Sequence, residues 1–137
     1  MPKSLEIYLM GKINCGEMLI DEFAKELEER GHFIREKWWE YEKLPTPYLD
    51  NMATSALASE AMIRAAVNCD VGILFPTDTI LGAAVEFGAA LASKKLIKPE
   101  KQIIVVNPFE VRQSVFYADP AVIAVRGLDQ VRRMQWY

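Results

Sequence analysis

Short apolar runs alternate along the chain with longer segments in which apolar residues recur at helical spacing. The runs are rich in aliphatic, β-branched or aromatic residues, as buried strands are, and lie at residues 5–10, 33–39, 71–75, 102–106 and 121–125. The segments with helical periodicity or high alanine content are residues 17–30, 51–68, about 79–93 and about 129–135. Gly31 stands where a C-cap glycine belongs, and Thr77, Asp78 and Thr79 are candidate N-caps of the third helix.

This alternation is typical of βαβ units, whose right-handed crossovers build a parallel sheet. The chain of 137 residues has the usual length of one domain. We therefore predict a single α/β domain over residues 1–137, a doubly wound (flavodoxin-like or Rossmann-like) sheet of about five parallel strands with helices on both faces. In such sheets ligands bind outside the carboxyl ends of the strands, where the strand order reverses.

Candidate binding residues should therefore lie in the loops that follow the predicted strands. These loops are residues 11–16, 38–48, 76–82 and 107–120. The last is long for a connection between a strand and a helix, which makes it a candidate for function or for contact with another subunit. In the second loop, Trp38 and Trp39 would make a wall on which a base can stack, although packing in the core is an equally good interpretation.

Composition and charge exclude several classes of function. The net charge is −3 and Lys and Arg are scattered, so neither nucleic acid nor an anionic membrane is an expected partner. No apolar stretch is as long as a membrane span, and the N-terminus does not resemble a signal peptide. Cys15, Cys69 and His32 cannot form a zinc site together, and His32 is expected at the surface. We expect a cytoplasmic protein without a metal or a cofactor.

Glu86 is the only ionisable residue from Thr79 to Ser93, in a chain of which 26% is charged. The helix would carry a core stripe and a stripe of small residues around the carboxylate, formed respectively by Ile80, Ala84, Phe87 and Leu91 and by Gly82, Glu86, Ala89 and Ser93. Small residues let a ligand or a neighbouring helix approach closely. A carboxylate so placed must be paired, hydrogen-bonded or left with a raised pKa, as catalytic carboxylates are. Alternatively, Glu86 faces solvent, or an Arg across a dimer interface.

The end of the first strand offers further candidates. Gly11, Lys12 and Asn14 join this strand to the first helix, where backbone N–H groups can hold an anion; a simple tight turn is the alternative. Tyr8 lies near the carboxyl end of the same strand, where its phenol would either reach a ligand or pack in the core.

Three segments of the chain resemble the nucleoside 2-deoxyribosyltransferase family, which includes transferases and related nucleotide N-glycoside hydrolases. They are IYLMGKIN (residues 7–14), CDVGILFP (residues 69–76) and GAAVEFGAALASKK (residues 82–95). The resemblance implies that Glu86, in the sequence Glu-Phe-Gly-Ala-Ala, is a nucleophile that attacks the anomeric carbon and forms a glycosyl ester. It also implies that Tyr8 positions this carboxylate.

The chain departs from the family at two acidic positions. Met62 stands where the family usually has an Asp before the third strand, with Glu60 two residues away, and Ile80 replaces an Asp of the transferases, with Asp78 nearby. A module that binds a nucleotide without turning it over is therefore a second hypothesis. A flavodoxin-like or receiver-like protein is disfavoured, because no Ser/Thr-rich phosphate loop follows the first strand and the third ends in Pro76.

The resemblance further implies a homo-oligomer with shared active sites. Family members often complete each site with the segment after the fourth strand of a neighbouring subunit. Here that segment is residues 107–120, with Asn107, Ser114 and Tyr117 as candidate contacts to a nucleoside or nucleotide.

Overall fold

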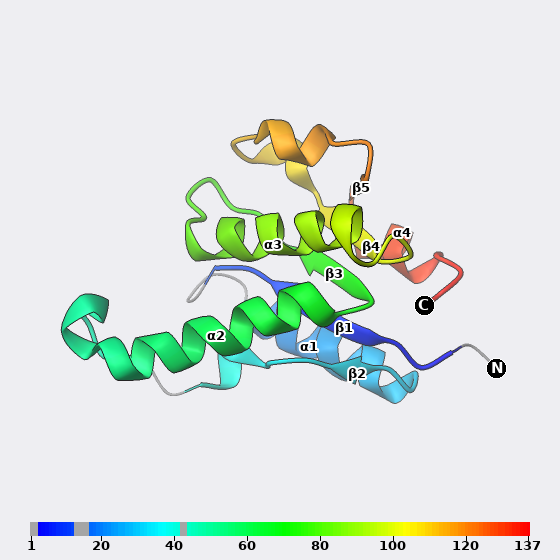
Figure 1. Cartoon of the computed structure of the whole chain (residues 1–137). Coiled ribbons are helices and arrows are strands. Elements are labelled where there is room, and N and C mark those ends of the chain that lie inside the picture. Colours follow the sequence, from blue (N-terminus) through cyan, green and yellow to red (C-terminus); the bar gives the residue numbers. More distant parts are fainter. Residues whose placement is uncertain (1–2, 13–16, 42–43) are drawn as a thin grey trace.

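A five-stranded parallel sheet forms the centre of the molecule and confirms the predicted doubly wound fold (Figure 1). The computed structural model describes residues 3–12, 17–41 and 44–137. The strands, in the order β2-β1-β3-β4-β5, are β1 (Glu6–Met10), β2 (Phe33–Ile34), β3 (Val71–Leu74), β4 (Gln102–Val106) and β5 (Val122–Val125). The chain leaves β1 toward β2 on one side and returns to β3 on the other. A ligand crevice is thus expected between the carboxyl ends of β1 and β3.

Helices cover both faces of this sheet. They are α1 (Glu17–Glu29), α2 (Met52–Asn68), α3 (Gly82–Leu96) and α4 (Leu128–Arg132). Figure 1 shows α2 and α3 side by side over one face, with α1 behind the sheet. On that opposite face α4 is joined to α1 by an ion pair of 2.8 Å between Arg132 Nε and Glu26 Oε2. No helix in the described part of the chain is long and apolar enough to cross a membrane.

The predicted second strand is wrong beyond its first residues. Arg35 N still donates to Ile7 O at 2.9 Å, but Glu36 has a φ of 41°, in the left-handed region, which ends the pairing with β1. A short 3₁₀ helix, Trp38–Glu40, follows. The two tryptophans therefore leave the plane of the sheet, and β2 is only two residues long.

The N-cap prediction for α3 is also wrong. The helix begins at Gly82 after Leu81, whose side chain makes no capping hydrogen bond. The predicted caps have tertiary partners: Asp78 Oδ1 accepts from Arg112 N at 2.7 Å, and Thr79 Oγ1 accepts from Lys12 Nζ at 2.7 Å. These contacts hold the loop before α3 against the ends of β1 and β4.

Two expectations at the helix ends have opposite outcomes. Gly31 has a φ of 93°, and its N–H donates to Glu28 O at 2.9 Å, so the predicted C-cap of α1 is confirmed.

His32 is buried, so its expected place at the surface is wrong. Its Nδ1 accepts from Leu5 N at 3.2 Å, and Trp136 covers its ring at a centroid distance of 5.8 Å. The C-terminal residues supply this cover.

The core stripe of α3 is correct in part. Phe87 and Leu91 are buried as predicted, whereas Ala84 is exposed and Ala83 takes its place against the sheet. The helix is therefore rotated about its axis relative to the predicted stripe, and Glu86 turns inward together with its buried neighbours.

Candidate active site

Glu86 and Tyr8 meet above the centre of the sheet. Glu86 lies in the first half of α3 and is only 7% exposed, and Tyr8, on β1, is fully buried. Tyr8 pairs in register with Gly72 of β3, so no side chain of β3 stands beside the phenol. Its Oη donates a hydrogen bond to Glu86 Oε1. This contact joins two residues that are 78 positions apart in sequence.

The surroundings of this pair change both pKa values. Burial raises the pKa of Glu86 to about 7, against the opposing effect of the hydrogen bond from Tyr8. Burial, followed by the negative charge of Glu86, raises the pKa of Tyr8 far above its usual range. Tyr8 therefore stays protonated as a donor, and Glu86 can gain or lose its proton near neutral pH. A carboxylate with this pKa can act as a nucleophile or as a base at physiological pH.

Glu86 borders a pocket of about 390 Å³ at the carboxyl ends of β1 and β3, which we call the site pocket. It is lined by residues from the ends of the first three strands, from the start of α3 and from the α2 region: Gly11, Lys12, Trp38, Tyr48, Met62, Thr79, Ile80, Leu81, Gly82, Ala83 and Glu86. A volume of this size falls within the range of small-molecule sites. Sequence analysis placed the ligand at this edge of the sheet.

The β2 side of the site pocket is aromatic and apolar. Trp38 is held in place, because its Nε1 donates to Leu9 O at 2.7 Å. Gly11 allows this close packing: a Cβ there would lie 3.6 Å from Trp38 Cζ2 and 2.9 Å from Ile20 Cδ1. Tyr48, which is 52% exposed, and Met62 complete this side. Trp39 turns away and donates from Nε1 to Asp21 Oδ1 at 3.0 Å.

The β3 side of the site pocket is polar. Lys12 is the only cation among the described residues that line the pocket, and its ammonium is held by the Thr79 hydroxyl at 2.7 Å. Gly82 lines this side at the start of α3. Asn14, the remaining candidate of this loop, lies outside the described residues.

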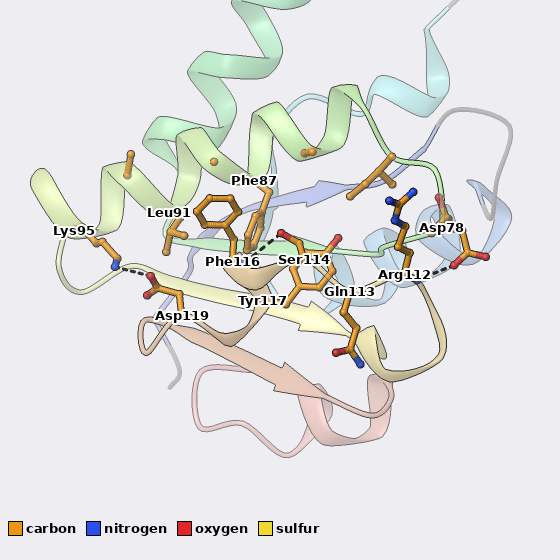
Figure 2. A pocket seen from close by; sticks show the side chains of 15 residues that line it. Asp78, Phe87, Leu91, Lys95, Arg112, Gln113, Ser114, Phe116, Tyr117 and Asp119 are labelled. Atoms are coloured by element: carbon orange, nitrogen blue, oxygen red, sulfur yellow. Dashed lines mark hydrogen bonds and ion pairs between the residues drawn. The ribbon is translucent and has the colours of Figure 1, made fainter.

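Four other predicted site residues lie away from the site pocket within one chain. Asp78, Ser114 and Tyr117 line a separate cavity of about 670 Å³ on the other flank of α3 (Figure 2). Tyr117 packs there against Phe87 with ring centroids 5.7 Å apart, and Ser114 caps a short 3₁₀ helix. Asn107 has a φ of 52° after β4, and its Nδ2 lies 3.3 Å from Glu110 Oε2. The chain therefore does not bring these residues to Glu86.

Glu86 is the only carboxylate among the described residues that line the site pocket. Met62 lines the site pocket, whereas Glu60 is exposed on α2. In the described ranges no group of three or more His, Cys, Asp and Glu residues is placed to hold a metal ion. Tyr48 was missed by sequence analysis, although it lies in a loop that the strand order places at the ligand edge.

Comparison with known proteins supports the fold. No protein-family model matches the chain. No characterised protein has a significantly similar sequence. A solved structure, the CMP N-glycosidase BcmB of Clostridium botulinum, matches with a TM-score of 0.63 over 93% of this chain and 98% of that one, at 16% sequence identity. The chain thus shares the fold of that enzyme.

Proposed function

We propose that this protein is an enzyme that cleaves the N-glycosidic bond of a nucleoside 5′-phosphate, with Glu86 as the nucleophile. The observation that carries this proposal is the buried Glu86 carboxylate, held by Tyr8 and bordering a pocket at the strand-order reversal. Two further observations support it. The fold is that of an enzyme described as a CMP N-glycosidase, and the sequence of α3 resembles the nucleophile helix of the nucleoside 2-deoxyribosyltransferase family.

The chemistry follows from the geometry of the pair. Tyr8 engages Oε1 of Glu86, which leaves Oε2 to attack C1′ of the sugar. The C1′–N bond breaks, its electron pair goes to the base, which takes up a proton from solvent, and a glycosyl ester of Glu86 forms. Water then attacks C1′ and releases a proton to solvent, and the electron pair of the C1′–O bond returns to Glu86, which restores the carboxylate. If a second base replaces water, the same intermediate gives glycosyl transfer.

The two sides of the site pocket suggest how the substrate lies. Lys12, supported by Thr79, would bind the phosphate with the help of the Gly11 backbone, and Gly82 would leave room for the sugar. Trp38 and Tyr48 would contact the base. Trp39 supports this wall from behind, at a centroid distance of 5.4 Å from Trp38.

The substitution Glu86→Gln tests the proposal. We expect the release of free base from CMP and other nucleoside monophosphates, measured by chromatography, to fall by at least about 10³-fold. Circular dichroism should show an unchanged fold. The matched control is Glu22→Gln, at an exposed position of α1 on the opposite face of the sheet, which should keep full activity. Full activity of Glu86→Gln would refute the proposal. Adding a second free base to the assay distinguishes the two reactions, because transfer forms a new nucleotide with that base and hydrolysis does not.

A second candidate function is nucleotide binding without turnover. It is favoured by Met62, an apolar residue of the site pocket where the family usually has an acid. Calorimetric titration of the same nucleotides would then show tight binding while chromatography detects no free base. Binding and base release together would exclude this alternative.

We also propose that the protein forms a homo-oligomer with shared sites. Ser114, which is half-buried, and Tyr117, which is buried, line a cavity on the flank of α3 away from Glu86. They would take part in a site only where a neighbouring subunit packs against this cavity. Light scattering after gel filtration should give a mass of at least twice 15.6 kDa. A monomer at assay concentration would contradict this.

A further inference from the structure

The two sides of the site pocket differ in their chemistry. On the β3 side, the Lys12 ammonium and the Thr79 hydroxyl are joined by a hydrogen bond of 2.7 Å. On the β2 side lie the rings of Trp38 and Tyr48 and the thioether of Met62. The only hydrogen-bond donor of the Trp38 side chain is engaged by Leu9 O. The end of the pocket left for a base is thus lined by aromatic rings and a polarizable thioether, with the Tyr48 hydroxyl as a polar group.

The residues on the β2 side of the site pocket affect how the C1′–N bond can break. A neutral base is a poor leaving group and needs a proton as it departs, and a placed acid contributes about 10²–10⁴-fold to such a step. Glu86 forms the new bond to carbon, and no other carboxylic acid is among the described residues that line the pocket. The indole and the thioether give no proton to the base, and the Tyr48 phenol and the Lys12 ammonium are far weaker acids than a carboxylic acid. The aromatic rings and the thioether attract cations instead.

Glu86 itself brings negative charge to this pocket. Its carboxylate is one of the groups that line the pocket, and it is almost completely buried. A positively charged ring bound next to the sugar would therefore be favoured by the charge of Glu86.

We infer that the base of the substrate is itself a cation, as in a pyridinium nucleotide or an N-alkylated purine nucleotide. This inference rests on the function proposed above and names its substrate class. The phosphate lies at Lys12, the sugar above Glu86, and the cationic ring against Trp38, Tyr48 and Met62.

The bond changes then balance without a second acid. Glu86 attacks C1′, the C1′–N bond breaks, and its electron pair neutralises the positive charge of the ring, which leaves as a neutral molecule. Water attacks C1′ of the ester, the electron pair of the C1′–O bond returns to Glu86, and the proton of the water passes to solvent. No oxidant or further reactant is needed. Tyr8 remains protonated and hydrogen-bonded to Oε1 throughout.

Matched pairs of substrates test this inference. One pair is 7-methyl-GMP and GMP, which differ by one methyl group and one positive charge, and the other is nicotinamide mononucleotide and CMP. Chromatography measures the released base, with the Glu86→Gln protein as the blank for spontaneous cleavage. We expect kcat/KM to be at least about 10²-fold higher for the cationic member of each pair. We also expect its pH profile to have a single rising limb near pH 7, the pKa of Glu86.

A substitution in the wall sharpens the test. Tyr48 is half-exposed, so Tyr48→Leu should fold normally while the cation loses one π face. The preference for the cationic substrate should fall about threefold, whereas Tyr48→Phe should keep it.

The possible results separate the two proposals. If neutral GMP and CMP are cleaved as fast as the cationic substrates, the inference on the base is wrong and the N-glycosidase function stands. If no substrate releases base faster with the native protein than with Glu86→Gln, the proposed function fails, and the inference fails with it.

Discussion

Two buried charges on the same face of the sheet show how this fold separates stability from chemistry. Lys101 precedes β4 at the amino edge and is fully buried, and its ammonium donates to Ala66 O at 2.8 Å, Val67 O at 2.7 Å and Ser93 Oγ at 3.0 Å. Glu86 lies toward the carboxyl edge, and among the described residues its carboxylate accepts from one donor, Tyr8. The lysine thus has an acceptor for each of its three protons, whereas the carboxylate keeps unused capacity.

The difference between them teaches how to interpret a buried ion. Lys101 closes the C-terminal end of α2, where unpaired carbonyls carry negative partial charge, and it borders none of the described pockets. Glu86 borders a pocket, and its remaining hydrogen-bond capacity is available to a ligand. Helix α3 contributes to both places, with Ser93 near its end and Glu86 near its start. A buried ion whose hydrogen-bond capacity is fully used within the protein stabilises the fold. A buried ion with unused capacity at a cavity is available to bind a ligand.

Lys101→Met is expected to have the largest effect on stability. Methionine has a similar length, but it removes the ammonium donor from the Ala66 and Val67 carbonyls and from the Ser93 hydroxyl. The Val67 carbonyl then keeps the Ser93 hydroxyl at 2.7 Å, and the Ala66 carbonyl keeps the weak Cys69 thiol donor at 3.5 Å. The free energy of unfolding in urea should fall by roughly 3 kcal/mol. Lys25→Met is the control, since Lys25 is exposed and pairs only with Asp21 on the surface of α1; its loss should cost under about 0.5 kcal/mol. Equal effects of the two substitutions would contradict the structural role of Lys101.

Glu86→Gln should change stability in the opposite direction, by up to about 3 kcal/mol at pH 8. The folded pKa of about 7 exceeds the unfolded value of 4.5, so the folded state binds more protons between these values and the native protein loses stability as pH rises through them. Glutamine does not titrate. The stability difference between variant and native protein, measured by urea unfolding, should therefore be small near pH 4.5 and reach its full size above pH 7. A pH-independent difference would show that Glu86 is not destabilised by burial.

The contrast between these two ions could be predicted from the sequence only in part. Glu86 was found because it is the only ionisable residue from Thr79 to Ser93, and the alternation of strands and helices predicted that this helix begins at the ligand edge. Lys101 was not found, because it follows Pro99 and Glu100 in a segment that resembles a solvated loop. Its burial depends on carbonyls at the end of α2, whose position only the packing of α2 against α3 determines.

Other differences have similar tertiary causes. The 33–39 strand has suitable residue types, but Glu36 turns the backbone into the left-handed region and moves Trp38 onto the pocket. His32 looks like a surface residue after a helix cap, yet Trp136 covers it from the far end of the chain. Tyr48 reaches the site pocket because α2 projects over the end of β1, and no local pattern shows this. Local signals predicted the elements and their order, and long-range contacts determined which side chains meet.

Tyr8→Phe should have a smaller energetic effect than the two substitutions above. It tests whether the hydrogen bond from Tyr8 keeps Glu86 ionised at neutral pH. The hydrogen bond from Tyr8 lowers the pKa of Glu86 against the effect of burial, so its loss should raise that pKa above 7. The rising limb of kcat/KM against pH should move upward by about one unit, which corresponds to roughly fivefold lower activity at pH 7 with recovery near pH 9. Tyr137→Phe is the control, because that phenol donates to Glu26 on the opposite face of the sheet. A limb that stays in place while activity falls at every pH would show that Tyr8 only orients the carboxylate. A shifted limb would mean that the hydrogen bond from Tyr8 determines whether Glu86 is ionised at neutral pH. The ammonium of Lys101, by contrast, has three acceptors.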